Sequence, residues 1–403
     1  MKKVLFVVAD TSSKKYTSQG SIQFKHFLLS LINFNLDFRV VTTKTNELFL
    51  NEKKINAVGV YKLPFLWIRT FFNKMFGGTL ILPDIYRFLI NPFLLRRSKQ
   101  IIKKEDCNII HTLSFPSSTH LVGLELKRKY NIPWVAQFYD PWISNPYRKI
   151  PSWLQKKDED LERLVVDNAD IILHTNENIR SLWIERYGSQ IANKIYVMPF
   201  NYSPHDYANL LNCEINYNEN KEKIIISYIG SISAQRNLND FLHAVIIFVN
   251  KYPNLRNKLL FKFVGSVSLD QIELIKEKCL EDLFEFIGVV PYSEVKKYYE
   301  DADVFLVIDR PMEKNIFFPS KIMNYFLYKK PILGITPKNG ITYRYLQEYN
   351  YLCFDNNDIY AISECLFKIA SDYKSILNFD TNILDCFAPN SISSRYINLI
   401  DKI

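Results

Sequence analysis

The chain has 403 residues, of which 48% are hydrophobic and 23% are charged, and its formal net charge is +9. The two fractions are ordinary for a globular protein and exclude a disordered or fibrous chain, while the length favours two domains. The basic excess suits an anionic partner, which could be a phosphorylated metabolite, a nucleic acid or an acidic membrane face.

Short apolar runs rich in β-branched residues alternate with stretches of helical spacing through the first half of the chain. The expected strands cover residues 4–8, 38–42, 57–61, 109–112, 134–138, 171–174 and 195–199. The expected helices cover residues 22–31, 119–130 and 154–169. Strands that are apolar throughout, alternating with helices, are typical of a parallel sheet covered on both faces.

The same pattern starts again after a polar stretch at residues 201–223, which lacks a clear period. The second set of expected strands covers residues 224–229, 260–264, 284–289, 304–308 and 332–335. The second set of expected helices covers residues 238–250, 269–280, 294–301, 321–328 and 359–370. We therefore expect two doubly wound α/β domains, whose ligands bind beyond the carboxyl ends of the strands in the cleft between the domains.

The sequence lacks the motifs of several functional classes. The six cysteines form no CxxC pair and no zinc spacing, which predicts reduced thiols in a cytoplasmic protein. The apolar run at residues 4–9 is too short for a signal peptide, and no stretch is long enough for a spanning helix. No GxGxxG or P-loop motif occurs. The D-x-D match at residues 158–160 lies inside an expected helix, and the match at residues 301–303 lies at a helix end before a strand. A metal-binding D-x-D would follow a strand, so we expect no obligatory metal.

The loop after the strand at residues 224–229 contains Gly230 and Ser231, and Arg236 follows just before a helix. A glycine lets the backbone approach a ligand, and an arginine beside the open amides of a helix start suits a diphosphate. An ordinary strand–helix loop with a surface arginine is the alternative.

A second motif reads F-F-P-S-K-I-M-N-Y and is followed by K-K-P-I-L-G. Pro319 and Ser320 would begin a helix in which Ser320 and Asn324 share a face, and Lys321 adds a cation at its start. The alternative is a capped amphipathic helix with a solvated lysine.

A third motif, G-V-V-P-Y-S-E-V with a later A-D-V, spans residues 288–304 and contains Val290 in a loop that could receive a nucleobase. A plain βαβ unit would explain it equally. In this order and spacing, the three motifs resemble the donor-binding domain of GT-B glycosyltransferases, and specifically the retaining family-4 enzymes that use nucleotide-diphospho-sugars. The resemblance covers residues 224–350 well and the first half more weakly.

The resemblance implies roles for residues of the second half. Arg236 matches the basic residue that contacts the diphosphate, and Lys321 would replace a second cation, because Ser231 stands where members often have an arginine. Asn324 stands where many members carry a glutamate that holds the ribose hydroxyls, and Glu313 is the carboxylate on the sugar side. The implied donor-binding set is Gly230, Ser231, Arg236, Val290, Glu313, Pro319, Ser320, Lys321 and Asn324.

The resemblance also implies an acceptor side in the first half. Gly20 and Ser21 match the glycine-containing loop after the first strand, and His111 matches a cleft histidine. Asp140 follows an expected strand and should point into the same cleft. The alternatives are a structural histidine and a turn with a packed indole. The implied catalytic residues are Arg236, Lys321, His111 and Asp140.

Apolar clusters edged with Arg and Lys occupy residues 61–104, which suits contact with an anionic membrane. A core-packing helix pair with a basic outer face is the alternative, and we expect no nucleic-acid partner because no RNA-binding motif is present.

The expected protein is thus an α/β enzyme of GT-B fold, with an acceptor-binding Rossmann-like domain at residues 1–203, a donor-binding one at 204–385, and a last helix at 386–403 that packs back on the first domain. It would be cytoplasmic or peripheral on the inner membrane face. It would transfer a sugar from a nucleotide-diphospho-sugar to a glycan or lipid-linked glycan, with retention and no obligatory cofactor, in polysaccharide, O-antigen or capsule assembly. The alternatives are a nucleotide-sugar epimerase of the same fold and a non-catalytic nucleotide- or glycan-binding module.

Overall fold

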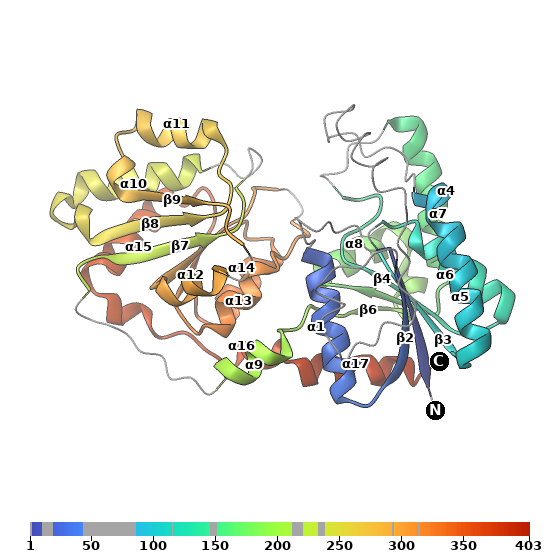
Figure 1. Ribbon diagram of the computed structural model, residues 1–403. Helices are drawn as coiled ribbons and strands as arrows, with labels where there is room; N and C mark the ends of the chain where they lie inside the picture. Colours follow the sequence, from blue (N-terminus) through green and yellow to red (C-terminus); the bar gives the residue numbers. More distant parts are fainter. Residues whose placement is uncertain are drawn as a thin grey trace. The chain divides into compact units, whose positions relative to one another are not determined.

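The chain folds into two compact units, which a computed structural model describes over residues 2–9, 19–42, 86–114, 116–145, 151–211, 221–232, 238–291, 294–312 and 315–403. One unit comprises Met1–Pro204 and Ala388–Ile403, and the other comprises His205–Phe387. Each is built around a six-stranded parallel sheet with helices on both faces (Figure 1). The expected α/β architecture of two doubly wound domains is therefore confirmed. The units divide after Pro204 and after Phe387, where we expected boundaries after residues 203 and 385.

The sheet of the first unit has the strand order β2-β1-β3-β4-β5-β6. Its strands are β1 (Lys3–Val8), β2 (Asp37–Thr42), β3 (Ile109–Leu113), β4 (Trp134–Phe138), β5 (Ile171–His174) and β6 (Ile195–Val197). The interior strands β3, β4 and β5 are buried along their whole length, which explains why their sequences are apolar runs and not alternating patterns. The strand expected at residues 57–61 lies outside the described residues.

Helices cover both faces of this sheet. They are α1 (Gln19–Asn33), α4 (Tyr86–Leu89), α5 (Asn91–Glu105), α6 (Thr119–Tyr130), α7 (Ser152–Asn168), α8 (Glu177–Tyr187), the 3-10 turn η1 (Ser189–Ile191) and α17 (Pro389–Ile400). The ends of α5 and α6 are set locally, because Asp106 and Asn131 follow them in left-handed conformations (φ 54° and 51°) that these residue types tolerate. The start of α8 is capped by Asn176, whose side chain accepts a hydrogen bond from the Ile179 amide at 3.1 Å.

The last helix, α17, packs beside α1 in the first unit (Figure 1). Its Ile392 and Tyr396 are buried in the same hydrophobic cluster as Phe6 and Phe27. Residues from the two extremes of the sequence therefore complete one core.

The sheet of the second unit has the strand order β12-β11-β10-β7-β8-β9. Its strands are β7 (Ile224–Ile229), β8 (Leu259–Val264), β9 (Phe284–Gly288), β10 (Val304–Ile308), β11 (Ile332–Ile335) and β12 (Leu352–Phe354). Sequence reasoning predicted the first five and missed β12, because a three-residue edge strand is too short to show a pattern.

The helices of the second unit are α9 (Pro204–Leu210), α10 (Asn239–Lys251), α11 (Leu269–Glu277), α12 (Val295–Asp301), α13 (Lys321–Leu327), α14 (Ile341–Glu348), α15 (Ile359–Ser371) and α16 (Ile383–Cys386), with 3-10 turns η2 (Pro253–Lys258), η3 (Glu281–Leu283) and η5 (Tyr373–Ile376). The helix expected at residues 269–280 ends earlier, at Glu277, because Cys279 takes a left-handed conformation (φ 53°). The main core of the unit lies between the sheet and helices α10 and α15.

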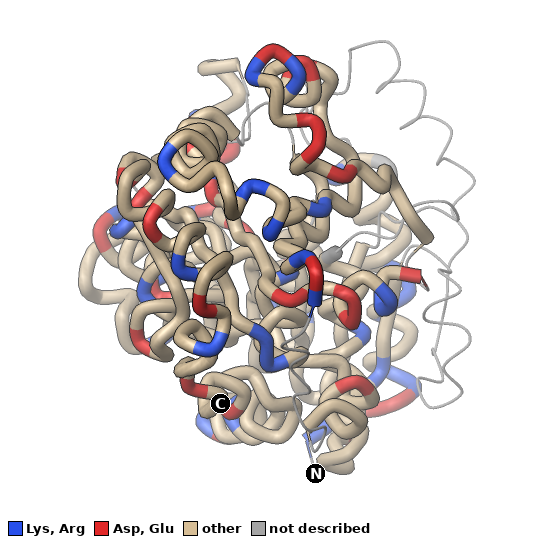
Figure 2. The backbone as a smooth tube through the Cα atoms, turned by 90° about the vertical axis from the view of Figure 1, so that its left-hand side faces the viewer, with Lys and Arg blue, Asp and Glu red and all other residues tan. Residues whose placement is uncertain are grey.

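No helix within the described ranges is long and apolar enough to cross a bilayer. Lys and Arg are interspersed with Asp and Glu along the described backbone (Figure 2). Many of them form pairs, such as Arg256 with Asp282 and Lys262 with Asp301. Both carboxylates of the second D-x-D match, Asp301 and Asp303, are paired in this way. Asp303 accepts hydrogen bonds from Lys221 and from the Ile225 amide.

Candidate functional site

Three neighbouring strands of the second unit end in glycines with positive φ. These are Gly230 after β7 (136°), Gly265 after β8 (134°) and Gly288 at the end of β9 (77°). The Gly230 amide donates to the Val264 carbonyl at 2.7 Å, and the Gly265 amide donates to the Gly288 carbonyl at 2.8 Å. A Cβ atom at Gly265 would lie 2.3 Å from the Gly230 oxygen, so only glycine fits there. The carboxyl edge of this sheet is therefore a compact rim of backbone.

Lys321 brings a positive charge to this rim from the start of α13. Its Nζ lies 3.1 Å from the centre of the Tyr228 ring. A Cβ atom at Gly230 would be 3.8 Å from the same Nζ. The ammonium group thus packs against the aromatic face of β7 as a cation–π contact and borders the glycine loop. The structure therefore brings the first two sequence motifs together.

Tyr325 fixes the position of Lys321. It lies one helical turn further along α13, on the same face as Lys321. Its hydroxyl accepts a hydrogen bond from the Ile229 amide at 2.9 Å, and its ring stacks on Phe305 with 4.3 Å between the ring centres. The spacing K-I-M-N-Y therefore anchors α13 to the end of β7 through tyrosine and places the lysine beside Gly230.

The remaining residues of the second motif differ from expectation in detail. The helix begins at Lys321 as expected, but the Ser320 side chain makes no capping hydrogen bond, because Ser320 itself has helical backbone angles. Asn324 donates its amide to the Tyr299 hydroxyl at 3.0 Å. That contact ties α13 to α12.

Val290, Ser231, Arg236 and Glu313 were also expected on the donor side. Val290 lies half-buried just past Gly288, next to Val289, whose side chain is exposed. Arg236 and Glu313 lie outside the described residues. Ser231 is exposed beside Gly230.

Asp140 lies just past the carboxyl end of β4 in the first unit. The backbone before it is held from both sides, because the Tyr139 amide donates to Ser114 Oγ at 3.1 Å and Thr175 Oγ1 donates to the Tyr139 carbonyl at 3.2 Å. Burial raises the pKa of Asp140 to about 6. A carboxyl group with such a pKa can accept a proton or a hydrogen bond from a hydroxyl near neutral pH.

Gly20 lies against the same loop. A Cβ atom at Gly20 would be 3.3 Å from the Tyr139 ring. Helix α1 begins at Gln19, so Gly20 and Ser21 belong to its first turn and do not precede it as expected. The structure therefore brings Gly20 and Asp140 to one region of the sheet edge.

His111 lies in the core and not at that edge. Strand β3 runs two residues beyond it, and the side chain is fully buried beside Phe6. Its Nδ1 is 2.8 Å from the Tyr396 hydroxyl and its Nε2 is 2.9 Å from Gln137 Oε1. Because an amide oxygen only accepts, Nε2 carries the proton and Nδ1 accepts from Tyr396. Burial lowers the pKa of His111 to about 3, so it is a neutral structural histidine.

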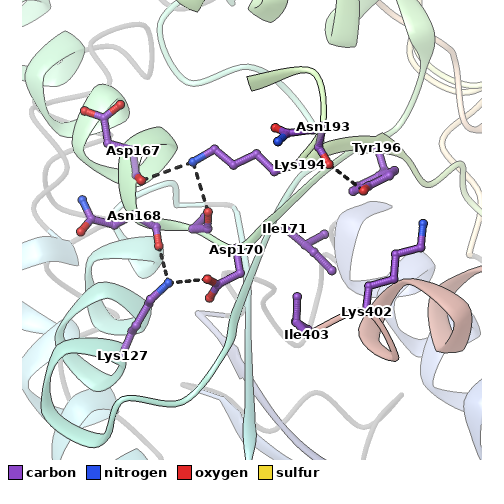
Figure 3. Close-up of a pocket in the computed structure, with 11 residues that line it drawn as sticks. Lys127, Asp167, Asn168, Asp170, Ile171, Asn193, Lys194, Tyr196, Lys402 and Ile403 are labelled. Carbon is purple, nitrogen blue, oxygen red and sulfur yellow. Dashed lines mark hydrogen bonds and ion pairs between the residues drawn. The ribbon is translucent and has the colours of Figure 1, made fainter. Parts of the chain in front are cut away.

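A hollow of about 460 Å³ lies at the opposite edge of the first sheet (Figure 3). Lys127 forms an ion pair with Asp170 at 2.6 Å and donates to the Asn168 carbonyl, while Lys194 donates to the Val166 carbonyl at 2.6 Å. These lysines satisfy carbonyls at the carboxyl end of α7. We therefore assign this hollow a structural role.

Sequence reasoning missed Gly265 and Tyr228, and it gave no role of its own to Tyr299, which lies in the third motif. Gly265 had a usable signal, since it directly follows the apolar run F-K-F-V just as Gly230 follows its own strand. The two tyrosines had none, because their roles depend on which strands and helices become neighbours.

Comparisons with known proteins identify both units. The family model "Glycosyltransferase Family 4" matches residues 34–199, and "Glycosyl transferases group 1" matches residues 214–383. No curated protein sequence matches the chain.

Solved structures share the fold over nearly the whole chain. The lipopolysaccharide outer core galactosyltransferase WaaB is 14% identical with a TM-score of 0.64, covering 99% of both chains. An E. coli trehalose-6-phosphate structure bound with UDP-2-fluoro glucose is 11% identical with a TM-score of 0.66, again covering 99% of both. A putative UDP-N-acetylglucosamine 2-epimerase from Listeria monocytogenes is 10% identical with a TM-score of 0.60, covering 99% of this chain and 96% of that one. With both domain models matched in order on this fold, the chain belongs to the GT-B glycosyltransferases of family 4, the glycosyl transferases group 1.

Proposed function

We propose that this glycosyltransferase moves a sugar from a nucleotide-diphospho-sugar to a glycan or lipid-linked glycan acceptor, with retention, in the assembly of a surface polysaccharide such as lipopolysaccharide, O-antigen or capsule. The observation that carries the proposal is the ammonium group of Lys321, held beside the Gly230 loop at the carboxyl edge of the second sheet. A cation next to open backbone is the chemistry that a diphosphate needs.

Transfer breaks the bond between the anomeric carbon and the diphosphate oxygen and forms a bond to the acceptor oxygen. Negative charge then develops on the leaving diphosphate, and a fixed cation that meets this charge lowers the barrier. We assign that role to Lys321 together with Arg236. The acceptor proton goes to the leaving phosphate, as the family resemblance implies. Asp140 accepts a hydrogen bond from the acceptor hydroxyl, and Gly20 and Ser21 border the same region.

The test of the diphosphate assignment is the rate of donor consumption, with and without acceptors, across a panel of UDP-, GDP- and dTDP-sugars. Lys321→Met keeps the stem that packs on Tyr228 and removes the charge, so the rate should fall about 100- to 1,000-fold, the effect of losing one such donor. Lys276→Ala, an exposed lysine of α11, serves as the control and should keep the wild-type rate. Near wild-type rates for both Lys321→Met and Arg236→Ala would contradict the assignment.

The same assay separates the two alternatives. An epimerase of this fold would convert the nucleotide-sugar with no acceptor present, and a binding module would bind the donor without any turnover. We further propose that the reaction needs no bound metal, so the rate should persist in excess chelator.

A further inference from the structure

Glu162 is an ionisable residue of the first unit that the mechanism above does not use. It lies on the buried face of α7, and its side chain is 0% exposed. A glutamate is almost never buried to this extent unless its carboxylate is paired or hydrogen-bonded, because a charged group that leaves water loses its hydration. The partners of Glu162 therefore indicate its role.

The two carboxylate oxygens of Glu162 hold two different segments. Oε2 accepts a hydrogen bond from the Ile143 amide at 2.9 Å, and Oε1 accepts one from the hydroxyl of Tyr187, the last residue of α8. Arg186 Nε lies 4.0 Å from the same Oε1. Burial raises the pKa of Glu162, whereas the hydrogen bonds that it accepts and the neighbouring guanidinium lower it. Glu162 thus ties the loop after β4 to α7 and α8.

Arg186 makes a second tie to the same loop. Its Nη1 donates to Ser144 Oγ at 3.1 Å, and its Nη2 forms an ion pair with Glu159 of α7 at 3.2 Å. The indole of Trp142 adds packing, since this residue is only 2% exposed. The segment 142–144 is therefore held both by burial and by polar contacts with two helices.

Asp140 lies on this loop, between two fixed points. Tyr139, just before it, is held through its backbone by side chains that follow β3 and β5. Pro141, just after it, has a fixed φ and restricts the backbone of Asp140 to extended conformations. The chain from Tyr139 to Ile143 therefore has little freedom as long as both ends are held, and Glu162 holds the second end.

Glu162 could act on Asp140 through its charge or through the loop that it holds. Burial alone raises the pKa of Asp140, and no neighbouring charge contributes to that shift. The state of Asp140 therefore depends on the loop, which keeps water away from its carboxyl group.

We propose that Glu162 is a positioning residue, which holds the segment 142–144 and thereby keeps Asp140 in place and away from water. The proposal rests on the proposed function in so far as Asp140 serves the acceptor. No bond is made or broken at Glu162, so the length of its side chain matters and its charge does not.

Three substitutions separate length from charge. Glu162→Gln keeps the length, because its amide oxygen can accept from the Ile143 amide and its nitrogen can donate to the Tyr187 hydroxyl oxygen. Glu162→Asp keeps the charge but is one methylene shorter, so it cannot reach both partners. Glu162→Ala removes both contacts. Leu31→Ala, at a buried residue in the last turn of α1, is the control for a general loss of stability.

The test measures the pKa of Asp140 by NMR in the full chain, labelled with carbon-13 at the aspartate carboxyl groups. The Asp140 signal is identified by its loss in Asp140→Asn, and thermal unfolding shows which variants are folded. We expect the pKa to be about 6 in the wild type, Glu162→Gln and Leu31→Ala. It should fall below about 5 in Glu162→Asp and Glu162→Ala, because water then reaches the carboxyl group.

The rate of sugar transfer is the second measurement, made with the panel of nucleotide-sugars and acceptors described above. It should fall about tenfold or more in Glu162→Asp and Glu162→Ala, because Asp140 is then misplaced, and Glu162→Gln should restore it. The proposal is overturned if Asp140 keeps a pKa near 6 in whichever of the Asp and Ala variants is folded. It is also overturned if Glu162→Gln or Leu31→Ala lowers this pKa as much as they do. A lowered pKa with an unchanged rate would support the positioning by Glu162 and remove Asp140 from the acceptor side.

Discussion

At the scale of single residues, the role proposed for Asp140 predicts an effect on stability as well as on activity. Its carboxyl group is desolvated by the surrounding chain, and no described residue donates a hydrogen bond to it, so the charged form is disfavoured and its pKa rises to about 6. A structural carboxylate would normally find partners, as Asp37 does with Lys3 and Arg39, which hold the pKa of Asp37 below its ordinary value. This contrast supports the acceptor-side role proposed for Asp140.

We predict that Asp140→Asn stabilises the protein while lowering the rate of sugar transfer. The folded-state pKa of about 6 exceeds the ordinary value of 3.8, so the charged carboxylate lowers the free energy of unfolding above pH 6. At 1.36 kcal/mol for each pKa unit, the gain should be about 2–3 kcal/mol at pH 7.5. The gain should shrink as pH falls through 6 and vanish below about 3.8. Urea unfolding at a series of pH values measures this gain.

Asp160→Asn, at an exposed position of α7, is the control and should change neither stability nor rate. Equal stability of Asp140→Asn and the wild type at pH 7.5 would show that Asp140 is well solvated in the folded state. An unchanged rate would remove it from the acceptor side.

At the scale of elements, the sequence predicted the strands that show a local apolar pattern. It missed the features that depend on which strands and helices become neighbours in the fold. The buried runs of β3, β4, β7 and β10 were recognisable because both sheet faces are covered. The short strand β12 had no such signal. His111 was misplaced because its side chain lies inside the core, where it contacts Tyr396 of α17 and Gln137 of β4, and the sequence pattern does not show these neighbours. The close packing of Gly230, Gly265 and Gly288 could not be predicted either, since it depends on β7, β8 and β9 being neighbours in the sheet.

Helices α4 and α5 show which described residues of the basic aromatic stretch at residues 61–104 are buried in the first unit. Residues 61–85 lie outside the described ranges. In α5 the buried positions are Asn91, Leu94, Ser98, Ile101 and Ile102, which form one stripe, as the core-packing alternative requires. Outside this stripe, Phe88 is 70% exposed and Phe93 is 44% exposed, with Arg87 and Arg96 nearby in sequence.

We propose that these two phenylalanines touch an anionic membrane surface. Vesicles of phosphatidylcholine and phosphatidylglycerol should retain the protein at low salt, and high salt should release it because the basic residues are then screened. The double substitution Phe88→Ser and Phe93→Ser should lower retention several-fold in a sedimentation assay. Leu269→Ser, at a residue 74% exposed in the other unit, should have no effect. Equal retention of the double variant and the wild type would exclude this contact.

At the scale of the whole molecule, the two units differ in how the chain builds them. The second unit is one continuous segment, His205–Phe387, whereas the first needs Ala388–Ile403 in addition to Met1–Pro204. Helix α17 supplies buried Ile392, Tyr396, Leu399 and Ile400 to the core of the first unit. Tyr396 also satisfies the Nδ1 atom of His111, and Ser393 Oγ donates to Ser30 Oγ at 2.9 Å.

We predict that residues 1–204 fold stably only when residues 388–403 are present. Each large apolar side chain buried by α17 contributes about 1.5–3 kcal/mol, so losing the helix removes an amount comparable to the whole stability of a domain. A fragment of residues 1–204 joined to 388–403 by a Gly/Ser linker should unfold cooperatively in urea. The fragment 1–204 alone should show a weak or absent transition, and the fragment 205–387 should unfold cooperatively without any addition. If residues 1–204 alone unfolded at the same urea concentration as the linked fragment, α17 would be an accessory to the first core and not a part of it.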